Sequence, residues 1–284
     1  MTRPEPGPPH ALTIDVEDWF QVWALSRHVP RASWDSRERR VAANTHRLLD
    51  LLGETGARAT FFTLGWVAGR EPALVRRIVA EGHELASHGW DHRLVYEQGE
   101  QEFRADVRRT RLLLEDIGGT AVEGYRAASF SIGAASPWAH RVLREEGYRY
   151  SSSSHPVRND HYGAGRVPRE AHVVDGLPEI PVSTLRLMGK SLPFAGGGYF
   201  RLLPHVWSRW AFARTARKEA PVVFYLHPWE IDPDQPRLPG LKLKTRLRHY
   251  GGLASFLPRL RRLLEAARWD RLDRAHPALA AASS

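Results

Sequence analysis

The sequence contains no cysteine and only 2 methionines among its 284 residues. Without cysteine the chain can form neither disulfides nor thiolate metal sites, so any metal would be held by histidine, aspartate or glutamate. No apolar stretch is long enough to cross a bilayer, and the proline-rich first ten residues lack the apolar run of a secretory signal. We therefore expect a cytoplasmic protein without a transmembrane segment.

The formal net charge is +9, and the basic side chains are distributed through most of the chain. The densest basic stretch is 242–262. Nucleic-acid binding requires a clustered basic face, preferably with aromatic side chains that stack on bases, so we expect no nucleic-acid partner. The basic stretch is compatible with a peripheral membrane contact, although a solvated helix face is its ordinary explanation. The sequence does not indicate an oligomeric state.

Apolar runs typical of strands alternate with segments of helical periodicity. This alternation predicts parallel βα units in a barrel or a doubly wound sheet. Residues 1–9 are expected to form a disordered tail, 10–235 one domain, and 236–284 a basic helical extension packed on it. The expected strands are 10–16, 59–64, 83–87, 122–126, 148–151, 171–174, 177–182 and 221–227, and the expected helices are 36–52 ended by Gly53, 72–81, 101–117, 136–146, 204–218 and 253–268.

Two histidines and an acidic cluster follow different expected strands. His88 and His92 are four residues apart, a spacing that places both rings on one face of a helical turn, where they can reach one divalent cation. Asp15, Glu17 and Asp18 close the first expected strand. Two histidines and one carboxylate leave a coordination position for water, as a hydrolytic metal site requires.

Arg126 and His227 also end expected strands, and the carboxyl ends of parallel strands gather at one face of such folds. Asp15 could then accept a proton from water, Arg126 could hold Asp15, and His227 could protonate a departing amine. Taken singly, Asp15 could cap a helix, Arg126 could form a surface ion pair, and His227 could be structural. Their joint placement after separate strands favours one hydrolytic site.

Several motifs together carry a family resemblance. They are TIDVEDWF (13–20), ATFF (59–62), GHELASHGWDH (82–92), GYRAASFS (124–131), GGGYFR (196–201), YLHPWEIDP (225–233) and RLRHY (246–250). With these motifs the sequence resembles the polysaccharide deacetylases of carbohydrate esterase family 4. It is most similar to the branch found in exosortase-associated exopolysaccharide gene clusters.

The resemblance implies a distorted (β/α)7 barrel of mainly parallel strands, with the active site at the C-terminal strand ends. The implied reaction is hydrolysis of the N-acetyl amide of acetylated amino sugars in a polysaccharide, which releases acetate. The implied cofactor is a divalent metal, usually zinc, with cobalt and other ions as alternatives. Two other readings are a metal-independent amidase of the related allantoinase-like type and a non-catalytic glycan-binding protein.

The resemblance also implies roles for individual residues. Asp15 matches the base, Arg126 the arginine that orients it, and His227 the general acid. His88 and His92 match the histidine ligands, and of the two candidates for the third ligand, Glu17 and Asp18, strand alternation favours Glu17 because it lies on the same side as Asp15. The expected substrate contacts are the aromatic residues Trp19, Phe20, Trp90, Phe130, Tyr199 and Trp229, together with Leu226 as an apolar wall under the acetyl methyl group.

The chain departs from the family pattern at two positions. Ala128 stands where the family normally has proline, and Ser151 stands where it usually has an aspartate that helps to hold the catalytic arginine. Either another acid, such as Asp160 or Glu179, takes over that role, or activity is reduced. From the sequence we predict that Ser151→Asp leaves deacetylase activity unchanged or raises it, and a large loss in an activity assay would contradict the alignment.

Overall fold

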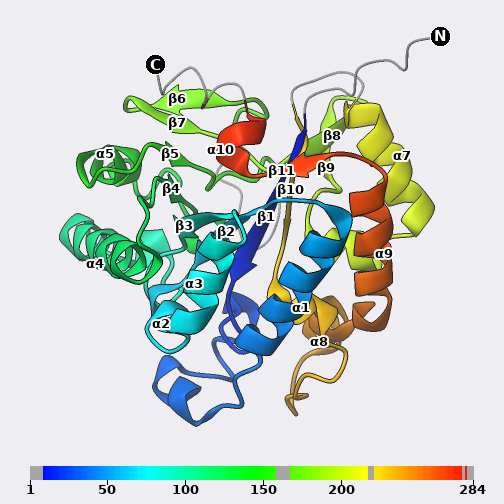
Figure 1. The fold of residues 1–284 in the computed structure, drawn as a ribbon, viewed down its shortest axis with the longest axis horizontal. Helices are drawn as coiled ribbons and strands as arrows, with labels where there is room; N and C mark the ends of the chain where they lie inside the picture. Colours follow the sequence, from blue (N-terminus) through cyan, green and yellow to red (C-terminus); the bar gives the residue numbers. More distant parts are fainter. Residues whose placement is uncertain (1–8, 158–166, 217–220, 277–278, 280–284) are drawn as a thin grey trace.

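The computed structural model describes residues 9–157, 167–216 and 221–276, together with residue 279 (Figure 1). The predicted disordered tail lies outside the described residues except for residue 9. Asp160, one of the two acids considered as a substitute for an aspartate at position 151, also lies outside them.

The described residues form a nine-stranded sheet with the order β10-β1-β2-β3-β4-β5-β7-β6, in which β11 also pairs with β1. Its strands are β1 (His10–Val16), β2 (Thr60–Thr63), β3 (Glu84–Ser87), β4 (Gly124–Tyr125), β5 (Tyr150–Ser151), β6 (His172–Val174), β7 (Leu177–Glu179), β10 (Val223–Leu226) and β11 (Trp269–Asp270). All neighbours from β10 to β7 are parallel, and only β6 runs antiparallel, against β7. The predicted α/β fold with a mainly parallel, curled sheet is confirmed.

The sheet nearly closes into a barrel, but the strands on either side of the gap, β7 and β10, are not paired. β7 and β10 are not neighbours, but the backbone N–H of Ser183 donates a hydrogen bond of 3.1 Å to the carbonyl oxygen of Val223 in β10. Ala195 likewise accepts a bond of 2.9 Å from the N–H of Tyr225. The carboxyl ends of the parallel strands therefore face a common space, as the barrel prediction requires.

Helices surround the strands on the outside (Figure 1). They are α1 (Val41–Thr55), α2 (Gly65–Ala68), α3 (Pro72–Ala80), α4 (Glu100–Gly118), α5 (Ala139–Glu145), α6 (Gly197–Leu202), α7 (His205–Ala216), α8 (Leu243–Tyr250), α9 (Leu253–Glu265) and α10 (Leu272–Ala275). Short 3₁₀ helices occupy η1 (Trp23–Leu25), η2 (Arg31–Ser36), η3 (Val95–Glu97), η4 (Ala128–Phe130) and η5 (Pro228–Ile231). None of the described helices is long and apolar enough to cross a membrane.

The prediction for the first long helix is wrong at both ends. The helix begins at Val41 because residues 31–36 form the separate turn η2. It continues through Gly53 to Thr55 and ends at Gly56, whose φ of 68° is a left-handed conformation that glycine adopts without strain. A glycine within an otherwise helical pattern is therefore not a reliable helix end.

The sequence interpretation missed several short elements. They include the hairpin of β8 (Thr184–Leu187) and β9 (Lys190–Pro193), whose turn residues Met188 and Gly189 both have positive φ. It also missed α6, α8, α10 and β11. Through β11, which pairs with the start of β1, the expected extension 236–284 contributes a strand to the central sheet.

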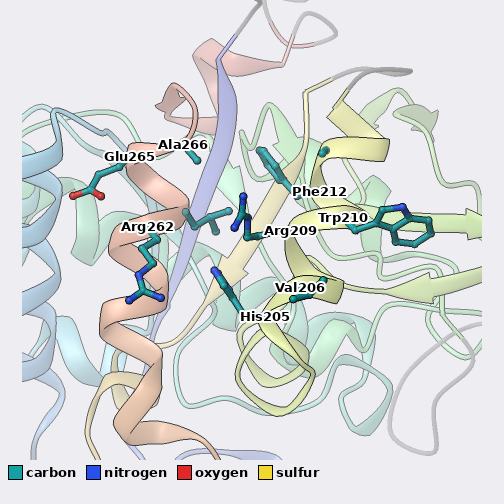
Figure 2. A pocket seen from close by; sticks show the side chains of 10 residues that line it. His205, Val206, Arg209, Trp210, Phe212, Arg262, Glu265 and Ala266 are labelled. Carbon is teal, nitrogen blue, oxygen red and sulfur yellow. The ribbon is translucent and has the colours of Figure 1, made fainter.

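A groove of about 860 Å³ lies between α7 and α9 (Figure 2). Its lining includes Val206 and Trp210 on α7 and Arg262 on α9, and it contains none of the residues predicted for catalysis or metal binding. Helix α7 itself buries Ser208, while Val206 and Trp210 are exposed. The groove is therefore a surface feature separate from the strand ends.

Candidate active site

Three predicted ligands converge where β1 and β3 end. Single ligand atoms of Glu17, His88 and His92 all lie within 4.8 Å of one another, and all three side chains are buried. His92 Nε2 lies 3.0 Å from Glu17 Oε2. The predicted helical turn between the histidines is wrong, because Gly89 (φ 74°) and His92 (φ 58°) fold residues 88–92 into a loop that brings the two rings together.

The protonation states of this cluster suit metal binding. His88 Nδ1 lies 2.8 Å from the carbonyl oxygen of Arg126, which can only accept, so Nδ1 carries the proton and Nε2 is left for a ligand. Burial lowers the pKa of His88 to about 4, which keeps the ring neutral. Burial alone would raise the pKa of Glu17, but His92, His227 and His88 together outweigh it and lower that pKa to about 2. A neutral His88 ring, a second histidine and one carboxylate form a donor set that fits zinc.

Asp18, the alternative third ligand, is not part of this cluster. Its Oδ2 accepts hydrogen bonds from the backbone N–H groups of Arg40 (2.9 Å) and Val41 (3.1 Å), and its Oδ1 accepts one from Trp19 (2.9 Å). Asp18 therefore holds the start of α1, where the backbone N–H groups of a helix lack partners of their own. Its assignment as a metal ligand is wrong, whereas Glu17 faces both histidines.

Asp15 and Arg126 form a buried ion pair beside the cluster. Arg126 Nη1 lies 2.7 Å from Asp15 Oδ1 and 2.8 Å from Thr13 Oγ1. The guanidinium also donates to the carbonyl oxygen and to the hydroxyl of Ser152, at 2.9 and 2.8 Å. Arg126 is 0% exposed, so these oxygens replace water completely around its charge. Thr13 and Ser152 were not predicted, because their oxygens have no catalytic signature in the sequence.

Glu179 does not replace the aspartate that the family has at position 151. Its Oε1 accepts the backbone N–H of Ser153 at 2.8 Å, and its Oε2 lies 3.0 Å from His140 Nε2. Ser151 is buried and bonds to the hydroxyl of Ser153 at 2.8 Å. The expectation for Glu179 is therefore wrong: within the part of the chain that the structure describes, Asp15 is joined around Arg126 by the neutral oxygens of Thr13 and Ser152.

His227 approaches from β10 on the far side of the cluster. Its Nε2 lies 3.6 Å from Glu17 Oε1 and 3.9 Å from Asp15 Oδ2, and its Nδ1 lies 3.2 Å from Glu230 Oε2. Burial by itself would lower the pKa of His227, but the Glu230 hydrogen bond and the charges of Glu17 and Asp15 raise it to about 9. His227 is therefore protonated near neutral pH, as a general acid requires.

Glu230 is a functional candidate that the sequence interpretation missed. It also accepts the backbone N–H of His227 at 3.0 Å, and its other oxygen pairs with Arg201 at 3.1 Å. A Cβ at Gly197 would lie 1.8 Å from Glu230 Oε2, so only glycine fits there. The GGGYFR motif thus supplies both the space for Glu230 and its cationic partner. The sequence does contain a signal that could have identified Glu230, namely an acidic residue three positions after His227.

Trp229 is enclosed between two histidines, His227 and His249. Its ring stacks on His227 at 5.2 Å and on His249 at 4.6 Å, and its Nε1–H donates to Glu17 Oε1 at 3.2 Å. His249 is held in turn by Gln235, with 2.9 Å between Nε2 and Oε1. Both faces of Trp229 are covered, so its predicted role as a sugar platform is wrong. Trp229 therefore contacts both Glu17, a metal-ligand candidate, and His227, the acid candidate.

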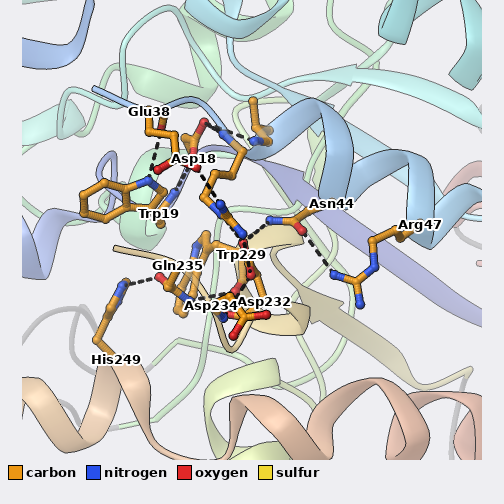
Figure 3. A network of polar contacts seen from close by, with 12 residues as sticks. Asp18, Trp19, Glu38, Asn44, Arg47, Trp229, Asp232, Asp234, Gln235 and His249 are labelled. Atoms are coloured by element: carbon orange, nitrogen blue, oxygen red, sulfur yellow. Dashed lines mark hydrogen bonds and ion pairs between the residues drawn. The ribbon is translucent and has the colours of Figure 1, made fainter. Parts of the chain in front are cut away.

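Other predicted substrate contacts also belong to the core. Trp19 is buried and donates its Nε1–H to the carbonyl oxygen of Glu38 (Figure 3). Phe20 is buried against Trp34 and Trp66. The predicted substrate-binding roles of Trp19 and Phe20 are wrong, because both side chains pack into the core just after strand β1.

The remaining predicted substrate contacts differ in their exposure to solvent. They are Phe130, Tyr199, Trp90 and Leu226. Phe130 and Leu226 are buried, whereas Tyr199 and Trp90 are half-buried. Phe130 and Tyr199 both contact the ring of His155, and Arg109 lies 3.7 Å from the centre of the Trp90 ring. Tyr199 and Trp90 therefore keep accessible ring surface for a ligand, and Leu226 stays a prediction as a wall beneath the acetyl group.

Comparisons with known families match the chain in two adjacent regions. Residues 32–151 match the family described as polysaccharide deacetylase, and residues 152–276 match a family described as a domain of unknown function (DUF3473). The first region contains His88, His92 and Arg126, and the second contains His227. Asp15 and Glu17 precede both matched regions, so the candidate site combines residues from both regions with the first strand of the chain.

Curated relatives match over short stretches. The chain is 37% identical to a peptidoglycan-N-acetylglucosamine deacetylase of Listeria monocytogenes over 75 residues, which are 26% of this chain and 16% of that protein. It is 48% identical to a chitooligosaccharide deacetylase of Sinorhizobium fredii over 48 residues, 17% of this chain and 22% of the relative. The chain therefore spans less than a quarter of the length of these two relatives.

A solved structure matches across nearly the whole chain. The crystal structure described as a "putative polysaccharide deacetylase from Mycobacterium smegmatis" has a TM-score of 0.62 and 22% sequence identity. The match covers 99% of this chain and 92% of that one. At this identity the similarity establishes the fold.

The surroundings of Ser151 predict a loss of stability for Ser151→Asp, whatever its effect on activity. The new carboxylate would lie beside Glu179, the register partner of Ser151 in β7, and away from Arg126. We expect the free energy of unfolding to fall by about 2 kcal/mol or more because two buried carboxylates repel each other. Ser152→Asp is the matched control, since its carboxylate meets the guanidinium and should cost less stability in thermal melting. Equal melting temperatures for wild type and Ser151→Asp would contradict this arrangement.

Trp229→Phe should weaken metal binding. The substitution retains an aromatic ring between the histidines but removes the N–H that holds Glu17. We expect zinc affinity, measured by competition with a chelating dye, to fall about tenfold or more, as is typical when the partner of a metal ligand is lost. Trp34→Phe is the control because the buried Nε1 of Trp34 has no hydrogen-bond partner among the described residues. A similar loss in both variants would rule out a specific role for the Trp229 N–H.

Proposed function

We propose, from the match of residues 32–151 to the polysaccharide deacetylase family, that the protein hydrolyses the N-acetyl amide of acetylated amino sugars in a polysaccharide. The observation that carries the proposal is the convergence of Glu17, His88 and His92 beside the Asp15–Arg126 pair, with His227 opposite. This set contains a metal-ligand group, a base and an acid within one buried site.

Glu17, His88 and His92 would hold a divalent cation, for which zinc is our first candidate and cobalt an alternative. When bound, such an ion polarises the amide carbonyl and lowers the pKa of a coordinated water. His88 offers its Nε2 because Nδ1 is engaged by the Arg126 carbonyl, and Glu17 is kept in position by Trp229. A metal-independent amidase would leave this cluster without a role.

Asp15 is the base in this proposal. Arg126 engages its Oδ1, which leaves Oδ2, 3.9 Å from His227, to accept the proton of the attacking water. His227 donates its Nε2 proton to the amide nitrogen as the carbon–nitrogen bond breaks. The water hydroxyl joins the acyl carbon, so the products are acetate and the free amine of the sugar. The full set of residues argues against a protein that only binds glycans.

The substrate class rests on the relatives. The proteins named above are deacetylases of peptidoglycan N-acetylglucosamine and of chitooligosaccharides, so a polymer or oligomer with N-acetylated glucosamine is the proposed substrate here. The half-buried rings of Tyr199 and Trp90 are the proposed sugar contacts. The exosortase-associated branch, a role in exopolysaccharide synthesis and the cytoplasmic location remain predictions.

Acetate release from N-acetylglucosamine oligomers, with and without a chelator, tests the proposal. We expect chelation and His88→Ala to abolish turnover, and Asp15→Asn to lower kcat by about a hundredfold or more, because each removes a group that the hydrolysis needs. Asp18→Asn is the control: it changes a neighbouring carboxylate that faces α1, so kcat should be retained. Full turnover after chelation, with metal removal verified, would exclude the proposed mechanism.

The alkaline limit of activity should depend on Glu230. His227 must be protonated to act as an acid, and its pKa of about 9 keeps it so at neutral pH, so kcat/KM should fall as the pH rises through that region. Glu230→Gln removes the hydrogen-bonded carboxylate that raises this pKa, so the alkaline limb should move to lower pH. Glu179→Gln, which alters a similar buried carboxylate–histidine pair with His140, should leave the limb in place. An unshifted limb in Glu230→Gln would refute the coupling.

A further inference from the structure

The net positive charge of the chain arises mainly in one segment, although basic side chains occur throughout the chain. Residues 237–264 contain eight Lys or Arg residues and no Asp or Glu, so this segment alone accounts for +8 within a chain of net charge +9. It comprises α8 and most of α9. The eight cations are Arg237, Lys242, Lys244, Arg246, Arg248, Arg259, Arg261 and Arg262.

Helix α8 exposes an apolar stripe within this basic segment. Its inner side buries His249 and Tyr250, whereas Leu243 and Leu247 are 61% and 56% exposed. The two leucines are four residues apart, so they lie next to each other on the helix surface. Exposed apolar residues are common singly, but an apolar stripe flanked by cations is typical of helices that lie on membrane surfaces.

The charges beside the stripe are available for a partner. Lys242 and Arg246 are exposed, and neither forms an ion pair with another residue in the described parts of the chain. The absence of any acid between 237 and 264 leaves their charges uncompensated within the segment. A surface that combines uncompensated cations with exposed leucines is complementary to anionic headgroups above acyl chains.

The stripe also lies close to the candidate active site. His249 of α8 stacks on Trp229, and Trp229 stacks on His227, so three rings in a row join α8 to the proposed acid. In Figure 1, α8 lies at the end of the molecule toward which β1 points. A surface bound by α8 would therefore lie near the ends of the strands that carry the catalytic candidates.

We propose that α8 docks the protein on an anionic lipid surface. Leu243 and Leu247 enter the boundary between headgroups and acyl chains, and Lys242 and Arg246 contact headgroup phosphates. Leucine side chains favour this occupant over a soluble anionic glycan, because sugar rings pack on aromatic faces and the exposed stripe has none. The proposal extends beyond the proposed function and does not depend on it.

Vesicle co-sedimentation of the full chain tests the proposal. We expect binding to phosphatidylcholine vesicles that contain a quarter phosphatidylglycerol, and much weaker binding to pure phosphatidylcholine. The double variant Lys242→Gln/Arg246→Gln should bind the anionic vesicles about thirtyfold more weakly, since each charge near the surface contributes about fivefold. Leu243→Ser/Leu247→Ser should weaken binding at least about tenfold by removing buried apolar area.

The control variant is Leu112→Ser/Arg108→Gln on α4, where an exposed leucine and an exposed arginine lie on a different helix. It should bind vesicles like the wild type. All variants should release acetate from a short soluble oligomer at the wild-type rate when vesicles are absent, which separates this proposal from the proposed function.

Three results with vesicles would overturn the proposal. They are no binding of the wild type to anionic vesicles, equal binding to neutral and anionic vesicles, and equal loss in the α4 control. A dimer in light scattering that both α8 double variants dissociate would assign the stripe to a second copy of this chain and would also overturn it.

Discussion

The buried pair of Arg126 and Asp15 is the interaction on which the candidate site depends. Both charges are removed from water, so each is stable only while the other and the surrounding oxygens of Thr13 and Ser152 are in place. The pair joins β1 to the residue after β4, two strands that are separated in the sheet by β2 and β3. The carbonyl of Arg126 also orients His88, so one residue sets both the base and a metal-ligand candidate.

The sheet gives these contacts their common location. β1 lies between β10 and β2, so Asp15 and Glu17 at its carboxyl end are close to His227 after β10 and to the loop after β3. Residues 32–151 and 152–276 match different families, yet the parallel pairing of β5 with β7 continues the sheet across their boundary. The region matched to a domain of unknown function thus supplies the candidate acid, its partner Glu230 and the serine that holds Arg126.

The stack of His227, Trp229 and His249 connects the outer helix α8 to the interior of the site. Trp229 reaches Glu17 with its N–H while its faces are covered by two histidine rings, so a single side chain couples the acid candidate, a ligand candidate and the C-terminal segment. The extension expected from the sequence is therefore more than a cover on the barrel. Through His249 it packs against Trp229, which contacts Glu17 and His227, and it carries the cationic surface with Leu243 and Leu247.

The sequence by itself determined the α/β architecture, the family resemblance carried by motifs between residues 13 and 250, and the expectation that Asp15, His88, Arg126 and His227 gather at one site. Strand periodicity and motifs are local signals, and parallel strand ends meet whatever the packing details. Only the tertiary structure decided that Glu17 and not Asp18 faces the histidines, that Trp229 is enclosed, and that Ser152 and Glu230 hold the catalytic candidates. Those outcomes depend on partners that are distant in the chain, such as Arg40 for Asp18 and Glu17 for Trp229. No local sequence pattern indicates such pairs.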